Sequence, residues 1–165
     1  MDAYAGIATF GICVSDVAEK VTSVEENSSS IQKAKEVLKS NNINNVELFA
    51  QDTLRYLKSI KKKFDIIILD PPRKGCTQEV LDEVLRHLKS NHSKAESDEI
   101  LRSAQNDAIA EGASKGKIIY VSCNPATLAR DLKYLTEHGA KVEGIQPFDM
   151  FCHTYHIENV AIINL

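Results

Sequence analysis

The chain has 165 residues, which is enough for one domain with its own hydrophobic core. Hydrophobic residues make up 43% and charged residues 26%, as in an ordinary globular protein, and no apolar run reaches the roughly 18 residues that a membrane helix needs. The net charge of −3, from 20 basic and 23 acidic residues, argues against a domain that binds nucleic acid by its overall charge.

Apolar runs of strand length alternate with stretches of helical spacing. This alternation predicts an α/β fold with a mostly parallel, doubly wound sheet. The last two strands are joined by a loop alone, so one of them is expected to run antiparallel. In chain order, the predicted elements are strand 21–25, helix 28–40, strand 46–50, helix 53–61, strand 64–69, helix 78–90, strand 117–122, helix 126–138, strand 141–146 and strand 159–165.

Two stretches depart from this pattern. Residues 91–115 are polar and lack an apolar stripe, so we interpret them as an insertion that is partly helical and acts as a solvated connector. Residues 1–4 lead directly into a turn, with almost no strand before it, although a doubly wound sheet needs a full first strand there. We therefore expect residues 1–165 to form one domain, the C-terminal part of a longer protein.

Neither the N-terminus nor the cysteines indicate export. The chain does not open on a basic stretch followed by an apolar segment, so the sequence predicts no signal peptide. Its four cysteines, Cys13, Cys76, Cys123 and Cys152, form no C-x-x-C pair and have no spacing typical of a disulfide framework, which argues against a zinc site. We expect a cytoplasmic protein with no membrane partner.

A turn of small residues occupies positions 2–10, where the first strand should pass into a helix. Small side chains let the backbone approach a ligand, and folds of this class bind ligands in the crevice at the carboxyl ends of the strands. Gly6 is the one glycine in this stretch, and a tight structural turn would have the same composition. The turn therefore predicts a ligand site only in combination with other residues.

Acidic residues supply that combination, because they follow three successive predicted strands. Glu25 ends one strand about 20 residues after the turn, where an acid accepts hydrogen bonds from ribose hydroxyls. Asp52 and Asp70 follow the next two strands. Carboxylates suit a cationic sulfonium better than a pyrophosphate, which favours helix N–H groups. The pattern thus predicts S-adenosylmethionine as cofactor in preference to a nicotinamide nucleotide.

Cys123 lies between a predicted buried strand and a predicted helix. Asn124 is suited to cap that helix, and Pro125 is suited to its first turn. The positive end of a helix dipole lowers the pKa of a nearby thiol and favours the reactive thiolate. We therefore interpret Cys123 as a nucleophile; the alternative is an inert cysteine at the end of a strand.

Three blocks of sequence resemble the RNA 5-methyluridine methyltransferases, the 23S rRNA and tRNA (uracil-5-)-methyltransferases. They are Asp-Pro-Pro-Arg-Lys-Gly at 70–75, Ser-Cys-Asn-Pro-Ala-Thr-Leu-Ala-Arg-Asp at 122–131 and Phe-Asp-Met-Phe-Cys-His-Thr-Tyr-His-Ile-Glu at 148–158, in the order of that family. With the N-terminal turn, the resemblance covers nearly the whole chain apart from 91–115. It implies a Rossmann-like fold of S-adenosylmethionine-dependent methyltransferases.

The resemblance also implies roles for individual residues. Cys123 would be the nucleophile that adds to C6 of uracil, and Glu158 would be the general base that removes the C5 proton. The reaction would transfer a methyl group to C5 of a uridine in RNA, and we expect 23S rRNA rather than tRNA as the substrate. We expect a monomer with no DNA partner. By position, the cofactor contacts would include Tyr4, Gly6, Thr9, Glu25, Asp52 and Asp70.

The chain departs from this family at several positions. Ala8 stands where the family usually has glycine, Ala5 where cysteine is common, and Cys152 where proline precedes His153. The family's RNA-binding β-barrel, present in many members, and a central region with a further cofactor contact have no counterpart in the 165 residues. We therefore expect these residues alone to bind S-adenosylmethionine weakly and to methylate RNA slowly or not at all.

Basic residues in or just after the first two of these blocks are candidates for contacting the substrate. Arg73 and Arg130, with Lys74 and Lys133, have the charge to contact phosphates or a flipped base. The alternative for each is a solvated surface charge.

Four alternatives to this function or site can be compared with the sequence. Amino-group methyltransferases place an aromatic residue after Asp-Pro-Pro, where this chain has Arg73. Cytosine-C5 methyltransferases place their cysteine after the fourth strand, whereas Cys123 follows the fifth. A metal site at His153, His156 and Glu158 lacks a further cluster of ligands. A non-catalytic module that binds S-adenosylmethionine or RNA remains the alternative from another class.

Overall fold

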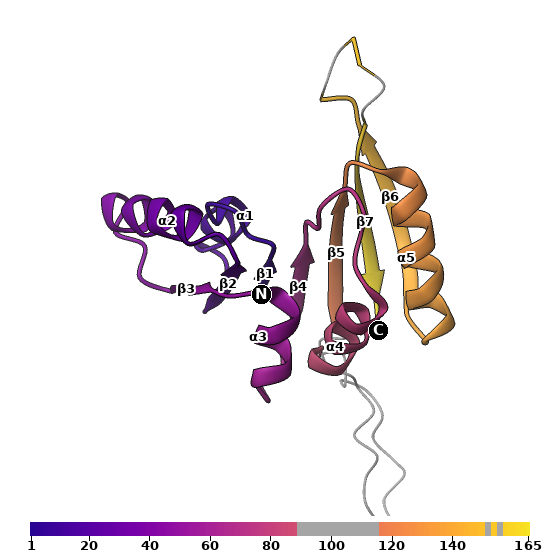
Figure 1. Cartoon of the computed structure of the whole chain (residues 1–165), viewed down its shortest axis with the longest axis horizontal. Helices are drawn as coiled ribbons and strands as arrows, with labels where there is room; N and C mark the ends of the chain where they lie inside the picture. Colours follow the sequence, from indigo (N-terminus) through magenta and orange to yellow (C-terminus); the bar gives the residue numbers. More distant parts are fainter. Residues whose placement is uncertain (89–115, 151–152, 155–156) are drawn as a thin grey trace, which may run out of the picture.

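The computed structural model describes residues 1–88, 116–150, 153–154 and 157–165 (Figure 1). The predicted insertion 91–115, Cys152 and His156 lie outside the described residues. Seven strands form one sheet in the order β3-β2-β1-β4-β5-β7-β6. The elements are β1 (Asp2–Ala3), α1 (Thr9–Cys13), β2 (Val21–Glu25), α2 (Ser28–Ser40), β3 (Val46–Ala50), α3 (Thr53–Ser59), β4 (Ile66–Leu69), α4 (Gln78–His87), β5 (Lys117–Ser122), α5 (Pro125–Glu137), β6 (Lys141–Phe148) and β7 (Glu158–Asn164).

Strand directions confirm the predicted doubly wound sheet. Strands β3, β2, β1, β4 and β5 are parallel neighbours. Strand β7 lies between β5 and β6 and is antiparallel to both. The antiparallel member of the last two strands is therefore β7, whose first residues lie at the carboxyl end of β5.

Two predicted helices end earlier than expected, and a tertiary contact accompanies the end of the second. Helix α3 ends at Ser59 and Ile60 is extended; helix α4 ends at His87 and Leu88 is extended. Leu88 forms a parallel bridge with Phe64, whose N–H donates to the His87 carbonyl at 2.8 Å. The same bridge holds Phe64, so the regular part of β4 begins at Ile66 and not at residue 64.

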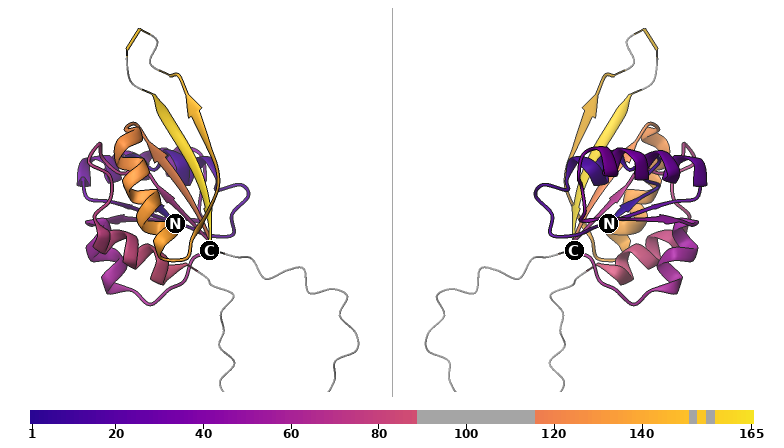
Figure 2. Two further views of the ribbon diagram at one scale, coloured as in Figure 1. Left: turned by 90° about the vertical axis from the view of Figure 1, so that its right-hand side faces the viewer. Right: turned by 90° about the vertical axis from the view of Figure 1, so that its left-hand side faces the viewer.

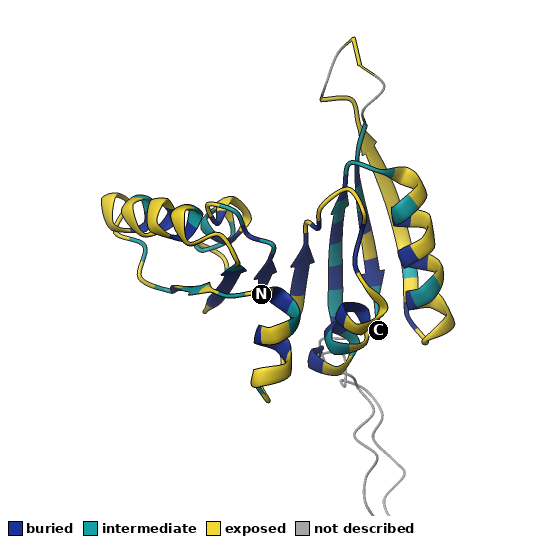
Figure 3. Ribbon diagram, viewed as in Figure 1, coloured by how far each residue is buried: buried dark blue, intermediate teal, exposed yellow. Residues whose placement is uncertain are grey.

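The sheet has a hydrophobic core on each face (Figures 2 and 3). On one face, α3, α4 and α5 bury the main cluster, which includes Leu57, Leu81, Leu132 and Tyr120. On the other face, α1 and α2 form smaller clusters with β2 and β3. Strand β6 is exposed along nearly its whole length. No helix in the described part of the chain is long and apolar enough to span a membrane.

Candidate active site

The predicted site residues lie along one edge of the sheet, where the parallel strands end. Glu25 is the last residue of β2, Asp70 directly follows β4, and Cys123 directly follows β5. Asp52 follows β3 and precedes α3. Glu158 begins the antiparallel strand β7, so it lies at the same edge. The expected convergence of the acids and Cys123 on this edge is what the topology produces.

The backbone turn at residues 4–8 is left-handed at three positions. Tyr4 has φ 60°, Gly6 has φ 55° and Ala8 has φ 62°. A Cβ placed on Gly6 would meet no atom within 4 Å, so the space over this residue is open. Left-handed conformations cost least at glycine, which gives a physical reason for the preference for glycine at the position of Ala8. The open backbone at Gly6 fits a ligand that lies against the turn.

Glu25 anchors this turn. Its Oε2 accepts a hydrogen bond from the Gly6 N–H at 2.9 Å, and its Oε1 accepts one from the Asn27 N–H at 2.9 Å. Each carboxylate oxygen has two lone pairs, so both oxygens retain acceptor capacity for hydroxyl groups. Glu25 is half-buried at the mouth of the turn. This arrangement fits a ribose bound beside Gly6.

Asp2 stabilises the segment that follows this turn, and no role was predicted for it from the sequence. The side chain is fully buried; its Oδ2 accepts hydrogen bonds from the Gly11 N–H at 2.9 Å and the Ser23 hydroxyl at 3.4 Å. Its Oδ1 is buried without a hydrogen-bond partner among the described residues. Burial raises the pKa of Asp2 to about 6. The sequence feature that could have indicated Asp2 is the position of an acidic residue directly before the run of small residues.

Asp52 and Thr9 lie at the first turns of helices. Asp52 is the N-cap of α3, and its Oδ1 accepts from the Arg55 N–H at 2.8 Å. This bond gives Asp52 a structural role, and its exposed position leaves the carboxylate accessible to a ligand. Thr9 is the exposed first residue of α1, immediately after the left-handed Ala8.

Tyr4 differs from the other predicted cofactor contacts. Its side chain is half-buried and packs against the main hydrophobic cluster. Burial and the neighbouring Cys76 thiol raise the pKa of Tyr4. The phenol is therefore directed into the core, which leaves the left-handed backbone of Tyr4 as the part that shapes the ligand turn.

Cys123 lies at the start of α5, as predicted. Asn124 is the N-cap, with its Oδ1 accepting from the Ala126 N–H at 3.1 Å, and Pro125 is the first helical residue. Cys123 is partly exposed, whereas Cys76 is buried and its pKa is raised to about 12 by burial. Cys123 therefore combines access to the edge of the sheet with the positive end of a helix.

The loop after Asp70 is held against α5. The Arg73 carbonyl accepts from Asn124 Nδ2 at 3.2 Å and from the Thr127 hydroxyl at 3.1 Å. Arg130, predicted as a substrate contact, uses its guanidinium to bind the carbonyls of Lys74 and Cys76 at 2.9 and 3.0 Å. The side chain of Arg73 is exposed. The geometry thus gives Arg130 a structural role.

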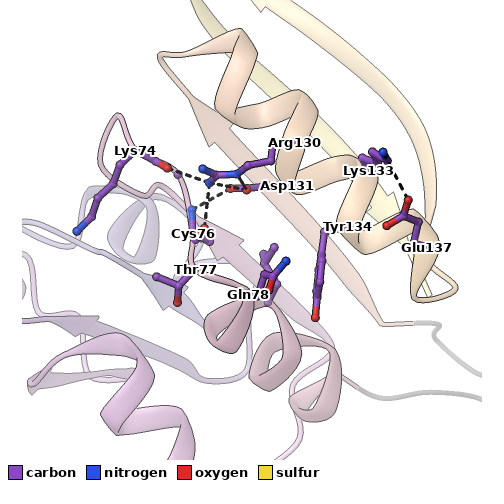
Figure 4. A pocket seen from close by; sticks show the side chains of 11 residues that line it. Lys74, Cys76, Thr77, Gln78, Arg130, Asp131, Lys133, Tyr134 and Glu137 are labelled. Carbon is purple, nitrogen blue, oxygen red and sulfur yellow. Dashed lines mark hydrogen bonds and ion pairs between the residues drawn. The ribbon is translucent and has the colours of Figure 1, made fainter.

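A groove of about 590 Å³ runs between this loop, α4 and α5 (Figure 4). Arg130, Lys133, Tyr134 and Glu137 line its α5 side. None of the predicted catalytic or cofactor-binding residues lines it, so the proposed chemistry does not take place there. Elsewhere in the part of the chain that is described, no group of three His, Cys, Asp or Glu residues is placed to hold a metal ion.

Comparisons with known proteins agree with this architecture. Residues 1–150 match the family described as Conserved hypothetical protein 95. An uncharacterized RNA methyltransferase of Thermotoga maritima is 37% identical over 99% of this chain and 31% of its own length. One of Clostridium tetani is 36% identical over 97% of this chain and 29% of its own length. The chain thus spans about a third of the length of these relatives.

Solved structures show the same fold. The tRNA (uracil-54, C5)-methyltransferase of Pyrococcus abyssi, in complex with S-adenosyl-L-homocysteine, has a TM-score of 0.70 and 30% identity, and the match covers 98% of this chain and 33% of that one. The precorrin-6y C5,15-methyltransferase of Geobacter metallireducens has a TM-score of 0.71 at 18% identity and shows the fold alone, covering 99% of this chain and 78% of that one. The fold is that of S-adenosylmethionine-dependent methyltransferases.

Proposed function

The chain belongs to the family described as Conserved hypothetical protein 95, and we propose that it is the catalytic domain of an RNA methyltransferase that acts on C5 of a uridine. One observation carries the proposal. Ser122 and Asn159 are paired at the end of the β5–β7 ladder, and the next residues beyond this pair are Cys123 and Glu158. A thiol that follows β5 and a carboxylate that begins the neighbouring strand β7 therefore adjoin the acid-lined edge of the sheet.

The cofactor side of this site fits S-adenosylmethionine. The open backbone at Gly6 would lie against the ligand, and the oxygens of Glu25 would accept the ribose hydroxyls. The carboxylates of Asp52 and Asp70 add negative charge at the same edge, which favours a cation. When bound, S-adenosylmethionine supplies an electrophilic methyl group on a positively charged sulfur.

Cys123 would activate the uracil ring. C5 of uracil is a poor nucleophile, but addition of the Cys123 thiolate to C6 forms a C–S bond and moves the C5–C6 π electrons into an enolate with electron density at C5. A soft thiolate suits this reversible conjugate addition better than an alkoxide. The ring must first leave its stack and enter the crevice.

Glu158 would complete the reaction. Once C5 carries both the methyl group and its original proton, Glu158 accepts that proton, the C5–C6 double bond re-forms and the C–S bond to Cys123 breaks. The half-buried position of Glu158 beside Asn159 suits a base that works away from bulk water.

Two observations favour RNA as the substrate: the relatives are described as RNA methyltransferases, and basic residues lie at this edge of the sheet. The curated relatives are described as RNA methyltransferases, and the solved relative at 30% identity acts on uracil 54 of tRNA. We propose rRNA or tRNA as the substrate, with exposed Arg73 and Lys74 on the loop after Asp70 as candidate phosphate contacts. The net charge of −3 indicates that much of the RNA-binding affinity would come from outside these 165 residues.

Methyl transfer tests the proposal directly. Transcribed 23S rRNA and tRNA are incubated with the protein and methyl-labelled S-adenosylmethionine. The RNA is then digested to nucleosides. Label in 5-methyluridine, lost in Cys123→Ala and retained in Cys13→Ala, supports the proposal. Label in another nucleoside contradicts it. Binding of both ligands without transfer would favour a non-catalytic binding module.

A further inference from the structure

Asp131 is the centre of a buried polar network between α5 and the loop at residues 71–77. The residue is 1% exposed. Its Oδ2 accepts hydrogen bonds from the Cys76 N–H at 2.8 Å and the Tyr120 hydroxyl at 2.6 Å. Its Oδ1 accepts from Arg130 Nε at 2.8 Å and lies 2.7 Å from Arg130 Nη2. One carboxylate thus joins strand β5, helix α5 and the loop.

Arg130 extends the network along the loop (Figure 4). Its Nη2 donates to the carbonyls of Lys74 and Cys76, so the guanidinium bridges two carbonyls that lie two residues apart while Asp131 balances its charge. Nearer to Cys123, the side chains of Asn124 and Thr127 bind the Arg73 carbonyl. The loop is therefore fixed to α5 from Arg73 to Cys76.

Gly75 permits the close approach on which this network depends. It has φ +73°, and a Cβ built on it would lie 2.5 Å from Asp131 Oδ2 and 2.6 Å from Arg130 Nη2. No side chain fits in that space. The loop thus lies directly against the carboxylate of Asp131 and the guanidinium of Arg130.

The two ends of this unit carry a proposed cofactor contact and the proposed nucleophile. Asp70 precedes the loop at the end of β4, and Cys123 precedes α5 at the end of β5. Resting on the proposed function, we propose that Asp131 is a positioning residue for methyl transfer: through Cys76, Tyr120 and Arg130 it fixes the Asp70 loop relative to Cys123. Asp131 touches neither substrate nor cofactor; it sets the distance between the acid edge and the thiol.

The test uses Asp131→Asn, which keeps the size of the side chain and removes its charge. Glu137→Gln on the same helix is the matched control, since Glu137 is exposed and its ion pair in the described chain is with Lys133. All assays run at a temperature well below the melting point of each variant. We expect Asp131→Asn to lower kcat for methyl transfer at least tenfold and to change the KM for S-adenosylmethionine less than threefold, with Glu137→Gln unchanged. An unchanged kcat overturns the proposal.

A second readout does not require turnover. The rate of alkylation by iodoacetamide is measured separately for Cys123 and Cys13 by mass spectrometry at pH 7. Displacing the α5 N-terminus should slow alkylation of Cys123 at least threefold, with Cys13 unaffected. Loss of a negative charge alone would speed alkylation of Cys123, and that result, or no change, overturns the proposal.

Two controls keep the outcomes distinct. If the wild-type full-length protein makes no 5-methyluridine, the proposed function fails, and the alkylation result alone decides the role of Asp131. If Asp131→Asn does not fold, Arg130→Gln replaces it, because the Arg130 side chain is 56% exposed and its loss breaks the link to the loop from outside. Arg130→Gln should slow Cys123 alkylation in the same direction, and unchanged alkylation overturns the proposal.

Discussion

The carboxylates of Asp70 and Glu158 lie at the same end of the sheet, because Asp70 follows its strand whereas Glu158 begins a strand that runs in the opposite direction. Asp70 follows β4, and Glu158 opens β7, which is antiparallel to its neighbour β5. Desolvation of the Asp70 carboxylate and the charge of Glu158 raise the pKa of Asp70. The two carboxylates therefore repel each other, and a bound cationic ligand would reduce this repulsion.

Replacing Glu158 should lower the pKa of Asp70. Glu158→Gln keeps the shape of the side chain and removes the charge that disfavours ionised Asp70, so the Asp70 titration should move to lower pH. Carboxyl-carbon NMR titration of both proteins measures this. Glu143→Gln is the control, because Glu143 pairs with Lys117 and Asn164 near the opposite end of the sheet. An Asp70 titration that is the same in Glu158→Gln and wild type would contradict the relationship.

Asp2 should make stability depend on pH. Burial raises its pKa in the folded state to about 6 from an ordinary 3.8, so the folded protein binds this proton more tightly than the unfolded chain does. Its contribution is most favourable below pH 3.8 and is lost as pH rises through 6. The difference amounts to about 3 kcal/mol. Urea unfolding from pH 3.5 to 7 should give Asp2→Asn a profile without this loss; parallel profiles would exclude it.

Gly75 and Gly139 should respond differently to alanine. Both have positive φ, but a Cβ on Gly75 would overlap Asp131 and Arg130, whereas a Cβ on Gly139 would meet nothing within 4 Å. Gly139→Ala should cost about 1 kcal/mol of unfolding free energy from backbone strain. Gly75→Ala should cost about 3 kcal/mol, because overpacking is added. Equal losses in denaturant unfolding would mean that the loop does not lie tightly on α5.

The sequence predicted those features that depend on local pattern. Strands β2, β3 and β5 and helix α2 begin and end at the predicted residues, because the apolar runs and the helical spacing that predict them are local features of the sequence. The antiparallel last pair followed from a loop too short for a crossover. The edge position of the acids followed from strand order alone.

The features that were missed depend on partners distant in the chain. Asp131 binds the Cys76 N–H across 55 positions, and no spacing in either segment indicates that contact. The same network turns Arg130, predicted as an RNA contact, toward backbone carbonyls. The early end of α4 likewise depends on the bridge between Phe64 and Leu88.

Glu158→Gln should stall the reaction after methyl transfer. Addition of Cys123 and transfer of the methyl group do not need the base, but release of the C5 proton does, so a methylated covalent RNA adduct should accumulate. Turnover should fall by about 10² to 10⁴, the usual contribution of a general base. Denaturing gels with methyl-labelled cofactor detect the adduct. Normal turnover by Glu158→Gln would assign the base to another group.

Trapping with 5-fluorouridine RNA tests the central claim most directly. Fluorine at C5 cannot leave as a cation, so the wild-type protein should stop as a methylated covalent complex with the RNA. Mass spectrometry of the digested complex should place the nucleotide on Cys123, and Cys123→Ala should form no complex. A nucleotide attached to Cys13, Cys76 or Cys152, or a complex that still forms in Cys123→Ala, would contradict the assignment of Cys123 as the nucleophile.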